Sequence, residues 1–415
     1  MFLSSICRNC ILLRSFRLST NGVKHSFLNT ERFCNMEDVE PEFRIKAFNL
    51  CREYIGGTWA KHSVKDFQII PLRGGVTNEI YLCYLPLEQT SGNYLTSSVN
   101  QNCDIIKTKK LLKEEPRQVL LRIFGTIIRE DGDAALSDSI IFSLLSERKQ
   151  APKLYGVFQE GRLEEYIPSR ALHTDELSNS EISKEIARKL AIFHQLSLPL
   201  KKTATKLNEQ IDRWVQQFTG FNSEPSAKKR DDYARFASYN FVEEAEFVKK
   251  LVSDSKSPVV FCHNDAQEGN ILYCEGKDRS QFSLVLIDYE YAGYSYREYD
   301  FANHFAEWAI NNNTDQYPYY AIDMSKYPTE EQQLVFFRSY MEAAGKPCSK
   351  DDEELFLREV FRFAVVTNFR WAMWSVVQEN LSTTAFGFLE YAEDRLKIYS
   401  EMKKEVPARL NFFSD

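Results

Sequence analysis

The chain has 415 residues, of which 43% are hydrophobic and 27% are charged, and its net charge at pH 7 is −7. This length exceeds what one hydrophobic core usually holds, so two lobes or two domains are expected. The negative charge argues against a nucleic acid as the main partner. It still allows a nucleotide, which needs only a few local cations and a metal ion.

The cysteines and the apolar segments narrow the class of protein further. Nine cysteines are scattered along the chain, and only Cys7 and Cys10 form a Cys-x-x-Cys pair, so no second pair completes a zinc site. An odd cysteine count in a chain of this length favours reduced thiols inside the cell. No uninterrupted apolar run reaches the roughly 18 residues of a membrane span, so none is expected.

The first 36 residues differ from the rest of the chain. Arginine and lysine occur there among Ser, Leu and Phe, and no acid precedes Glu31. A mitochondrial presequence shares this basic, acid-poor composition. The alternative is a disordered leader, bypassed by translation from Met36, in a cytoplasmic protein.

Predicted elements begin near Glu42 with an amphipathic helix that runs through Cys51 to Trp59. Strands are predicted at 67–70, 80–85 and 119–124, with a turn at 73–78. Residues 89–116, rich in Ser, Asn, Thr and Lys, are expected to form a long surface insertion in a hairpin. A helix over 133–149 and a hairpin with strands at 154–158 and 161–166 complete a small lobe of antiparallel sheet.

Helical periods dominate the chain after Ser180. Apolar residues that recur every three to four positions predict helices over 182–198, 208–218, 231–253, 330–344, 352–379 and 385–402. We therefore expect an α+β protein with two lobes in a protein-kinase-like arrangement. The antiparallel-sheet lobe, residues 37–163, would bind the nucleotide, and the mainly helical lobe, residues 164–415, would carry the catalytic and substrate-binding residues.

The most informative segment starts with His263-Asn264-Asp265, which follows the apolar run 259–261. Asn270 comes soon after it, and Asp288 ends the next apolar run, 284–287. Protein kinases use the same order of parts: a catalytic-loop Asp near the substrate hydroxyl, then an Asn and a second Asp that hold metal ions. The set predicts phosphoryl transfer, with Asp265 as the base and Asn270 and Asp288 as metal ligands. His263 is predicted to be structural and to tie the loop by hydrogen bonds.

Three upstream features are candidates for nucleotide contact. The turn Arg73-Gly74-Gly75-Val76-Thr77-Asn78 can close its backbone over phosphates, although a Gly-Gly pair between strands usually marks only a tight turn. Arg122, a cation in an apolar strand, either pairs with phosphates or forms a structural salt bridge to Asp138 or Glu147. Glu165 lies in segment 164–168, which is either a hinge beside an adenine ring or a simple connector.

A polar and aromatic cluster follows the catalytic segment and ends in Glu307-Trp308. Within it, Arg297 and Asp300 are spaced to form a buried pair. Further on, Trp371 and Trp374 share one face of a predicted helix, with Tyr391 on the next helix. Such a Trp pair usually serves core packing. Beside a phosphoryl-transfer centre, rings and a carboxylate also suit a quaternary ammonium, which has no N–H donors.

These motifs resemble those of the choline/ethanolamine kinase family over roughly residues 42–403. The resemblance is carried by segments 261–270, 287–291, 296–308 and 371–378. It implies a protein-kinase-like fold, ATP and Mg²⁺ as cofactors, and a cytoplasmic enzyme, often a homodimer. The reaction implied is phosphorylation of choline to phosphocholine, the first step of phosphatidylcholine synthesis by the CDP-choline route. An ethanolamine kinase, or a non-catalytic nucleotide-binding scaffold of the same fold, is the alternative.

Taken residue by residue, the resemblance makes Asp265 the catalytic base and Arg122 the phosphate-binding cation. It assigns nucleotide and metal contacts to Gln267, Asn270 and Asp288, and a choline pocket to Tyr291, Glu307, Trp308, Trp371, Trp374 and Tyr391. Trp308 after Glu307 favours choline over ethanolamine. Two positions depart from the family pattern: many members have Gln at the position of Glu165 and Glu at that of Asp138. The shorter acid is expected to pair less well with Arg122.

Overall fold

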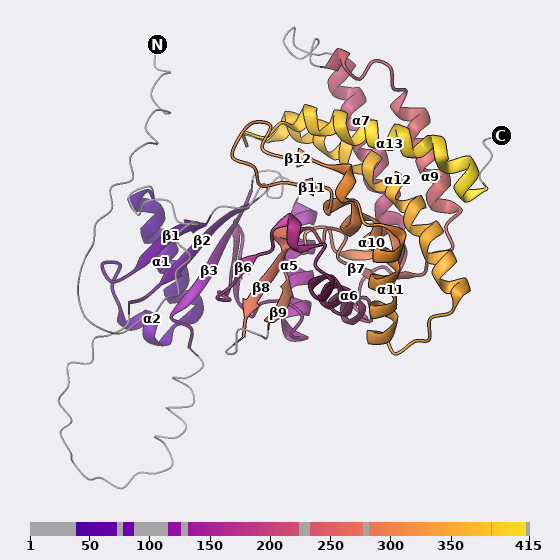
Figure 1. Cartoon of the computed structure of the whole chain (residues 1–415). Helices are drawn as coiled ribbons and strands as arrows, with labels where there is room; N and C mark the ends of the chain where they lie inside the picture. Colours follow the sequence, from indigo (N-terminus) through magenta and orange to yellow (C-terminus); the bar gives the residue numbers. More distant parts are fainter. Residues whose placement is uncertain are drawn as a thin grey trace, which may run out of the picture.

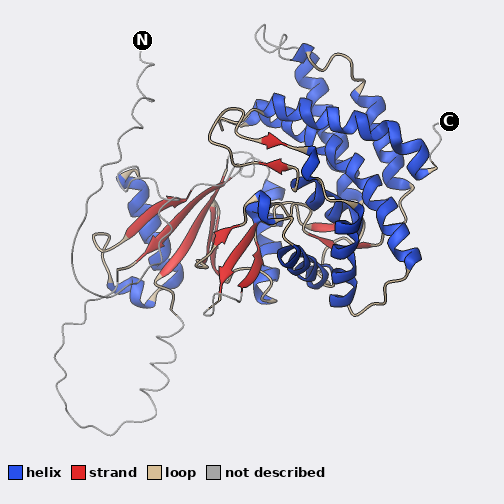
Figure 2. Ribbon diagram, in the orientation of Figure 1, coloured by secondary structure: helices blue, strands red, loops and turns tan. Residues whose placement is uncertain are grey.

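The computed structural model describes residues 39–72, 78–86, 115–125, 132–223, 233–276, 282–382 and 384–411. The expected leader, nearly all of the expected insertion and Arg73–Thr77 of the expected glycine turn lie outside the described residues. Figures 1 and 2 show a smaller strand-rich lobe and a larger helical lobe, so the predicted α+β, two-lobed architecture is confirmed. Among the described helices, none is long and apolar enough to cross a lipid bilayer.

The smaller lobe is a five-stranded antiparallel sheet in the order β1-β2-β3-β5-β4. Its strands are β1 (Gln68–Leu72), β2 (Asn78–Tyr84), β3 (Gln118–Phe124), β4 (Leu154–Phe158) and β5 (Gly161–Glu165). Side chains alternate along β3: Val119, Leu121 and Ile123 are buried in one core with residues of the first helices, and Arg122 points to the opposite face. The sheet continues two residues past the expected lobe boundary at residue 163, because β5 ends at Glu165.

The predicted first helix is in fact two helices. α1 (Pro41–Ile55) ends at Gly56, and α2 (Gly57–Lys61) begins immediately after it. Gly56 has φ 68°, a left-handed conformation that glycine adopts without steric cost, and its N–H donates to the carbonyl oxygen of Arg52. The amphipathic period of the sequence continues across this break, which is why it did not reveal the end of α1.

Two small sheets lie at the start of the larger lobe and hold the loops that carry the predicted catalytic residues. β7 (Val259–Cys262) pairs with β10 (Gly293–Tyr296). β8 (Ile271–Glu275) pairs with β9 (Phe282–Leu286) on one side and with β6 (Arg170–Ala171) on the other. The loop after β7 and the loop after β9 therefore lie side by side, with only the β8–β9 hairpin between them in the sequence.

Helices build the rest of the larger lobe: α6 (Ser180–His194), α7 (Thr205–Ser223), α9 (Phe241–Ser253), α10 (Arg297–Glu307), α11 (Glu330–Ala343), α12 (Lys350–Leu381) and α13 (Phe388–Leu410). α12 is the central helix, since it packs against α7, α9, α10, α11 and α13. It begins with a capping box between Ser349 and Asp352. α5 (Gly132–Glu147) lies between the sheet and this lobe (Figure 1).

One helix starts later than the sequence predicts. The expected helix over 231–253 begins at Phe241, because the Asn240 side chain caps it by accepting a hydrogen bond from the N–H of Glu243. Residues 231–232 lie outside the described residues. Between α10 and α11 the chain forms a short hairpin, β11 (Ile310–Asn311) with β12 (Ala321–Ile322), which leads toward the predicted aromatic cluster.

Candidate active site

The loop after β7 is anchored from below by Asp300, the fourth residue of α10. Its carboxylate accepts hydrogen bonds from the backbone N–H of His263 at 2.8 Å and of Asn264 at 2.7 Å, and His194 Nε2 lies 2.9 Å away. Burial by itself would raise the pKa of Asp300, but the hydrogen bond and charge of His194 and the backbone N–H donor hold it below its ordinary value. A fully buried carboxylate thus fixes the backbone that immediately precedes Asp265.

This arrangement corrects the expected Arg297–Asp300 pair. Arg297 Nε instead donates to Glu298 Oε1 at 2.8 Å, at the start of α10. Asp300 lies further into the helix and faces the catalytic loop rather than the arginine. Arg297 also lies over the rings of Phe337 and Tyr340, so its guanidinium is held by Glu298 and these rings and not by Asp300.

The loops after β7 and β9 are joined by hydrogen bonds around Asp265, Asn270 and Asp288. Asn270 Nδ2 donates to the Asp265 carboxylate and to the Asp265 carbonyl oxygen, both at 2.9 Å. His263 Nε2 lies 3.0 Å from the carbonyl oxygen of Ile287, so its predicted structural role is confirmed. Asn264 and Asp288 have φ values of 64° and 65°, a strained conformation that Asn and Asp tolerate better than most residues.

Arg122 reaches this centre from the sheet of the smaller lobe. Its Nη1 lies 3.6 Å from Asp288 Oδ2, and its Nε donates to Glu164 Oε1 at 3.3 Å. The expected structural partners were wrong: Asp138 pairs with Arg162, and Arg122 pairs with Glu164 on the neighbouring strand. Among the described residues, Arg122 Nη1 has no hydrogen-bond partner although it is buried. A donor left in this state is suited to an anionic ligand.

A cavity of about 150 Å³ opens beside these loops. It brings together nine of the predicted site residues: Asp265, Gln267, Asn270, Asp288, Tyr291, Glu307, Trp371, Trp374 and Tyr391. Four further lining residues were not predicted as site residues: Glu290, Asn312, Phe386 and Phe388. Glu290 was recognised only as part of the polar cluster. Asn312 lies just after β11, and Phe386 and Phe388 lie at the start of the helix predicted over 385–402, where apolar residues are expected to pack in the core.

One side of the cavity is a corner of aromatic rings. The Tyr291 and Trp371 ring centroids lie 5.4 Å apart at 80°, and those of Trp371 and Trp374 lie 5.3 Å apart at 83°. Rings set almost at right angles present more than one face to the same small volume, which suits an organic cation. The guanidinium carbon of Arg370 lies 4.5 Å from the Trp371 centroid and 5.2 Å from the Tyr291 centroid. This buried arginine holds the two rings from outside the cavity.

The other side of the cavity is strongly acidic. Asp265, Asp288, Glu290 and Glu307 all line it. Burial raises the pKa of Asp265 well above its ordinary value, and the charges of Glu307, Glu290 and Asp288 raise it further. Carboxylate and amide oxygens are the ligands that Mg²⁺ prefers, and Asn270 and Asp288 supply both types. The donor set and its excess of negative charge therefore fit a divalent cation.

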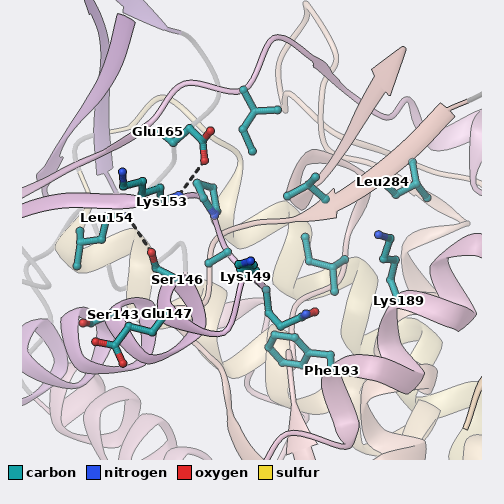
Figure 3. Close-up of a pocket in the computed structure, with 16 residues that line it drawn as sticks. Ser143, Ser146, Glu147, Lys149, Lys153, Leu154, Glu165, Lys189, Phe193 and Leu284 are labelled. Atoms are coloured by element: carbon teal, nitrogen blue, oxygen red, sulfur yellow. Dashed lines mark hydrogen bonds between the residues drawn. The ribbon is translucent and has the colours of Figure 1, made fainter. Parts of the chain in front are cut away.

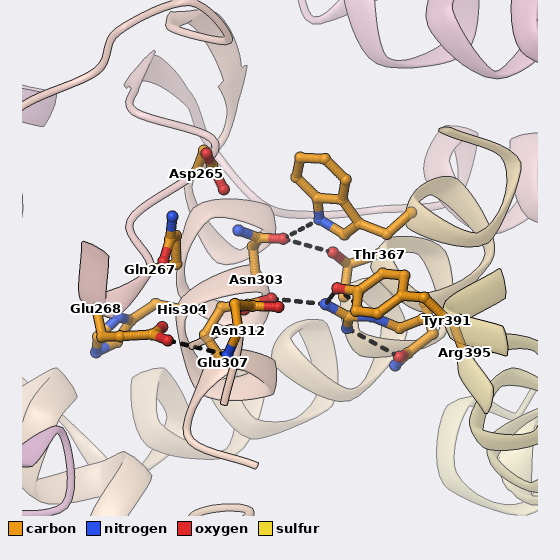
Figure 4. A network of polar contacts seen from close by, with 12 residues as sticks. Asp265, Gln267, Glu268, Asn303, His304, Glu307, Asn312, Thr367, Tyr391 and Arg395 are labelled. Atoms are coloured by element: carbon orange, nitrogen blue, oxygen red, sulfur yellow. Dashed lines mark hydrogen bonds and ion pairs between the residues drawn. The ribbon is translucent and has the colours of Figure 1, made fainter. Parts of the chain in front are cut away.

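Glu307 is held from behind by a residue that the sequence did not single out. Arg395 Nη2 donates to Glu307 Oε1 at 2.6 Å, and Asn312 Nδ2 donates to Glu307 Oε2 at 3.0 Å (Figure 4). Arg395 also donates to the hydroxyl oxygen of Tyr391, one helical turn earlier on α13. The spacing of Tyr391 and Arg395 on one helix face was the available signal.

Trp308, predicted to bind substrate, does not line the cavity. Trp308 is buried in the main core, and its indole N–H donates to His304 Nε2 at 3.2 Å. Glu307 is the last residue of α10, and the next side chain is rotated away from it by the helical turn. Trp308 packs edge-to-face against Phe305 of the same helix.

Glu165 and Asn78 are described but do not line this cavity. Glu165 lines a second, larger cavity of about 660 Å³ between the end of α5, β9 and α6 (Figure 3). There its Oε2 accepts a hydrogen bond from the backbone N–H of Lys153 at 3.0 Å. Asn78 is buried at the start of β2, and its Oδ1 accepts from the N–H of Gly125 at 3.4 Å. The expected contacts of Arg73, Gly74, Gly75, Val76 and Thr77 lie outside the described residues.

Comparison with known proteins agrees with this geometry. The choline/ethanolamine kinase family model matches residues 69–400. The chain is 37% identical to a human choline/ethanolamine kinase over 367 residues, which cover 87% of this chain and 86% of that protein. It is 36% identical to the choline kinase alpha of Mus musculus over 396 residues, with coverages of 89% and 83%.

Two solved structures share the fold. The ethanolamine kinase of Plasmodium vivax has a TM-score of 0.67 at 21% identity and covers 89% of this chain and 91% of its own. The choline kinase of Cryptosporidium parvum has a TM-score of 0.62 at 22% identity, with coverages of 88% and 96%. The family model spans the catalytic loops, the cavity and most of both lobes. The chain belongs to the choline/ethanolamine kinase family.

Proposed function

We propose that this protein transfers the γ-phosphoryl group of ATP to the hydroxyl of choline and forms phosphocholine and ADP. The observation that carries the proposal is the composition of the smaller cavity, where Asp265, Asn270 and Asp288 face the rings of Tyr291, Trp371 and Trp374. The residues proposed for phosphoryl transfer and the aromatic rings therefore line the same cavity, which has a volume of about 150 Å³. This volume suits a small organic cation rather than a sugar antibiotic.

Asp265 is proposed to accept the hydroxyl proton of the substrate, because it lines the cavity and is oriented by Asn270. Asn270 and Asp288 are the proposed ligands of Mg²⁺, which would neutralise charge on the phosphate oxygens. Arg122 is proposed to contact the phosphates, since its buried Nη1 faces Asp288. Nucleotide contacts are also proposed for Arg73–Asn78, Gln267 and Glu165.

The cationic end of choline is proposed to lie against Tyr291, Trp371, Trp374 and Tyr391. A trimethylammonium group gains cation–π and dispersion attraction from ring faces, about 0.5–2 kcal/mol per ring. Ethanolamine is a second candidate acceptor, because Glu290 also lines the cavity and can accept an N–H donor. The relatives include proteins named choline/ethanolamine kinase, which supports testing both.

The test is a coupled assay of ADP release by the full chain with Mg²⁺, ATP and either choline, ethanolamine or an aminoglycoside. We expect turnover with choline, identified as phosphocholine in the product. Asp265→Asn should lower kcat by about 10²–10⁴-fold and leave nucleotide binding intact. Asp254→Asn, at an exposed helix end remote from the cavity, is the matched control. If none of the three acceptors leads to ADP release, a non-catalytic scaffold is favoured. Turnover of Asp265→Asn within tenfold of wild type would remove Asp265 as the base.

A further inference from the structure

Arg395 lies beneath the cavity and is not exposed at all. Its guanidinium makes hydrogen bonds in three directions: to Glu307 Oε1 at 2.6 Å, to the Tyr391 hydroxyl at 2.6 Å and to Asn368 Oδ1 at 3.1 Å. Figure 4 shows Arg395 between Glu307 and Tyr391. Both of these side chains line the cavity. Arg395 itself does not line the cavity. It touches two side chains that do.

These contacts determine what Glu307 can offer to a ligand. One carboxylate oxygen is bonded to Arg395, and the other accepts from Asn312 at 3.0 Å. The carboxylate therefore faces the cavity with its charge balanced by a guanidinium and both oxygens already bonded. A charge-assisted hydrogen bond of this kind is strong and fixes the geometry of its acceptor.

The two candidate acceptors differ in how much they need such a carboxylate. A primary ammonium has three N–H donors, which lose water when the cation enters the cavity and must find new acceptors. A quaternary ammonium has no N–H donors and loses none of these bonds, so ring faces are sufficient for it. A carboxylate that is already paired thus penalises the primary ammonium more than the quaternary one.

We propose that Arg395 is a specificity-determining positioning residue, which pairs with Glu307 so that the cavity favours a quaternary over a primary ammonium. The inference rests on the proposed function. It adds a reason why the cavity would bind choline better than ethanolamine. Neither the substrate nor the reacting atoms need to touch Arg395. A purely structural role, in which the pair only ties α10 to α13, would affect both acceptors equally.

The experiment compares kcat and KM for choline and ethanolamine in three variants of the full chain. Arg395→Gln should lower the choline-to-ethanolamine ratio of kcat/KM by about tenfold, mainly through a lower KM for ethanolamine, because Glu307 can then accept its N–H donors. Arg395→Lys keeps a positive charge and should leave the ratio within about threefold of wild type. Asn312→Ala removes the other bond to Glu307 and should shift the ratio in the same direction by about threefold.

A matched control separates this effect from simple loss of a buried arginine. Arg362 is also buried on a helix of the same lobe, where its Nε donates to Glu359 Oε1 at 3.2 Å, and it does not line the cavity. Arg362→Gln should weaken folding and leave the substrate ratio unchanged. If Arg395→Gln does not fold, Asn312→Ala decides the question alone.

The proposal is overturned if Arg395→Gln, or Asn312→Ala where the first does not fold, lowers kcat/KM equally for both acceptors. A ratio that moves toward choline overturns it as well. Failure of the proposed function has a different outcome, since wild-type protein would then phosphorylate neither acceptor. Turnover of both acceptors with an unmoved ratio would refute only the assignment of Arg395.

Discussion

Asp300 offers the sharpest test of how the fold positions the catalytic loop. It makes no contact with the cavity, yet it accepts hydrogen bonds from the N–H groups of His263 and Asn264 and pairs with His194. Asp300→Asn keeps the size of the side chain but has one acceptor oxygen instead of two. One backbone N–H of the loop must then lose its partner or meet an NH₂ group.

The magnitude follows from these contacts. A buried N–H without a partner costs about 1–3 kcal/mol, and a hydrogen bond to a charged acceptor contributes about 1.5–3 kcal/mol. We therefore expect Asp300→Asn to lower the free energy of unfolding by about 3–5 kcal/mol. Asp265 follows the released backbone directly, and a displacement near 1 Å can lower turnover by about 10²-fold.

The assays are chemical denaturation at pH 7 and steady-state kinetics with choline. Asp254→Asn serves as the control and should change stability by no more than about 0.5 kcal/mol, as surface substitutions usually do. The reasoning is refuted if Asp300→Asn unfolds within about 1 kcal/mol of wild type and retains kcat within threefold. In that case the loop would be held by other contacts, such as the His263–Ile287 hydrogen bond.

Two further predictions concern the aromatic corner and a buried histidine. Trp374→Leu removes one ring of the corner and should raise the KM for choline by about 2–30-fold, the equivalent of about 0.5–2 kcal/mol. The KM for ethanolamine should rise by less. An equal rise in both KM values would indicate a packing role for Trp374. Burial lowers the pKa of His304 from 6.5 to about 4, so its neutral imidazole stabilises the fold fully above pH 6.5, and this contribution is lost as the pH falls toward 4. Wild type should lose about 2 kcal/mol more stability than His304→Gln between pH 7 and pH 5 in denaturant titrations, and equal losses would contradict this assignment.

The catalytic centre could be predicted from sequence because its parts are close together in the chain. Asp265 and Asn270 belong to one loop, and Asp288 follows the β8–β9 hairpin, so the order along the chain already predicts that they lie together. Helical periods likewise located α6, α11 and α12 to within a few residues. The positions of helices can be predicted from the sequence because the pattern of apolar residues that marks a helix repeats between neighbouring turns.

The partners of buried charges could not be predicted, because they depend on strand register and helix rotation. The structural alternative for Arg122 was a salt bridge to Asp138 or Glu147 on the helix behind it. In the sheet, Arg122 lies opposite Arg162, so Glu164, two residues further along the same strand face, reaches both arginines. Arg162 then takes Asp138, and the shorter acid is not the partner of Arg122. No spacing in the sequence distinguishes these two pairings.

Two of the acids that line the smaller cavity are each paired with one buried arginine, which lowers the net negative charge of the cavity. Arg122 lies next to Asp288, and Arg395 lies next to Glu307. Both guanidinium groups are buried, and neither lines the smaller cavity. Within the described residues, no arginine or lysine pairs with Asp265 in this way. The acid proposed to take the substrate proton is therefore one whose charge no arginine or lysine among the described residues balances, so incoming cations can do so. A metal ion on one side of the cavity and an ammonium group on the other would each lower the pKa of Asp265, so its ionised form is favoured when both ligands are in place.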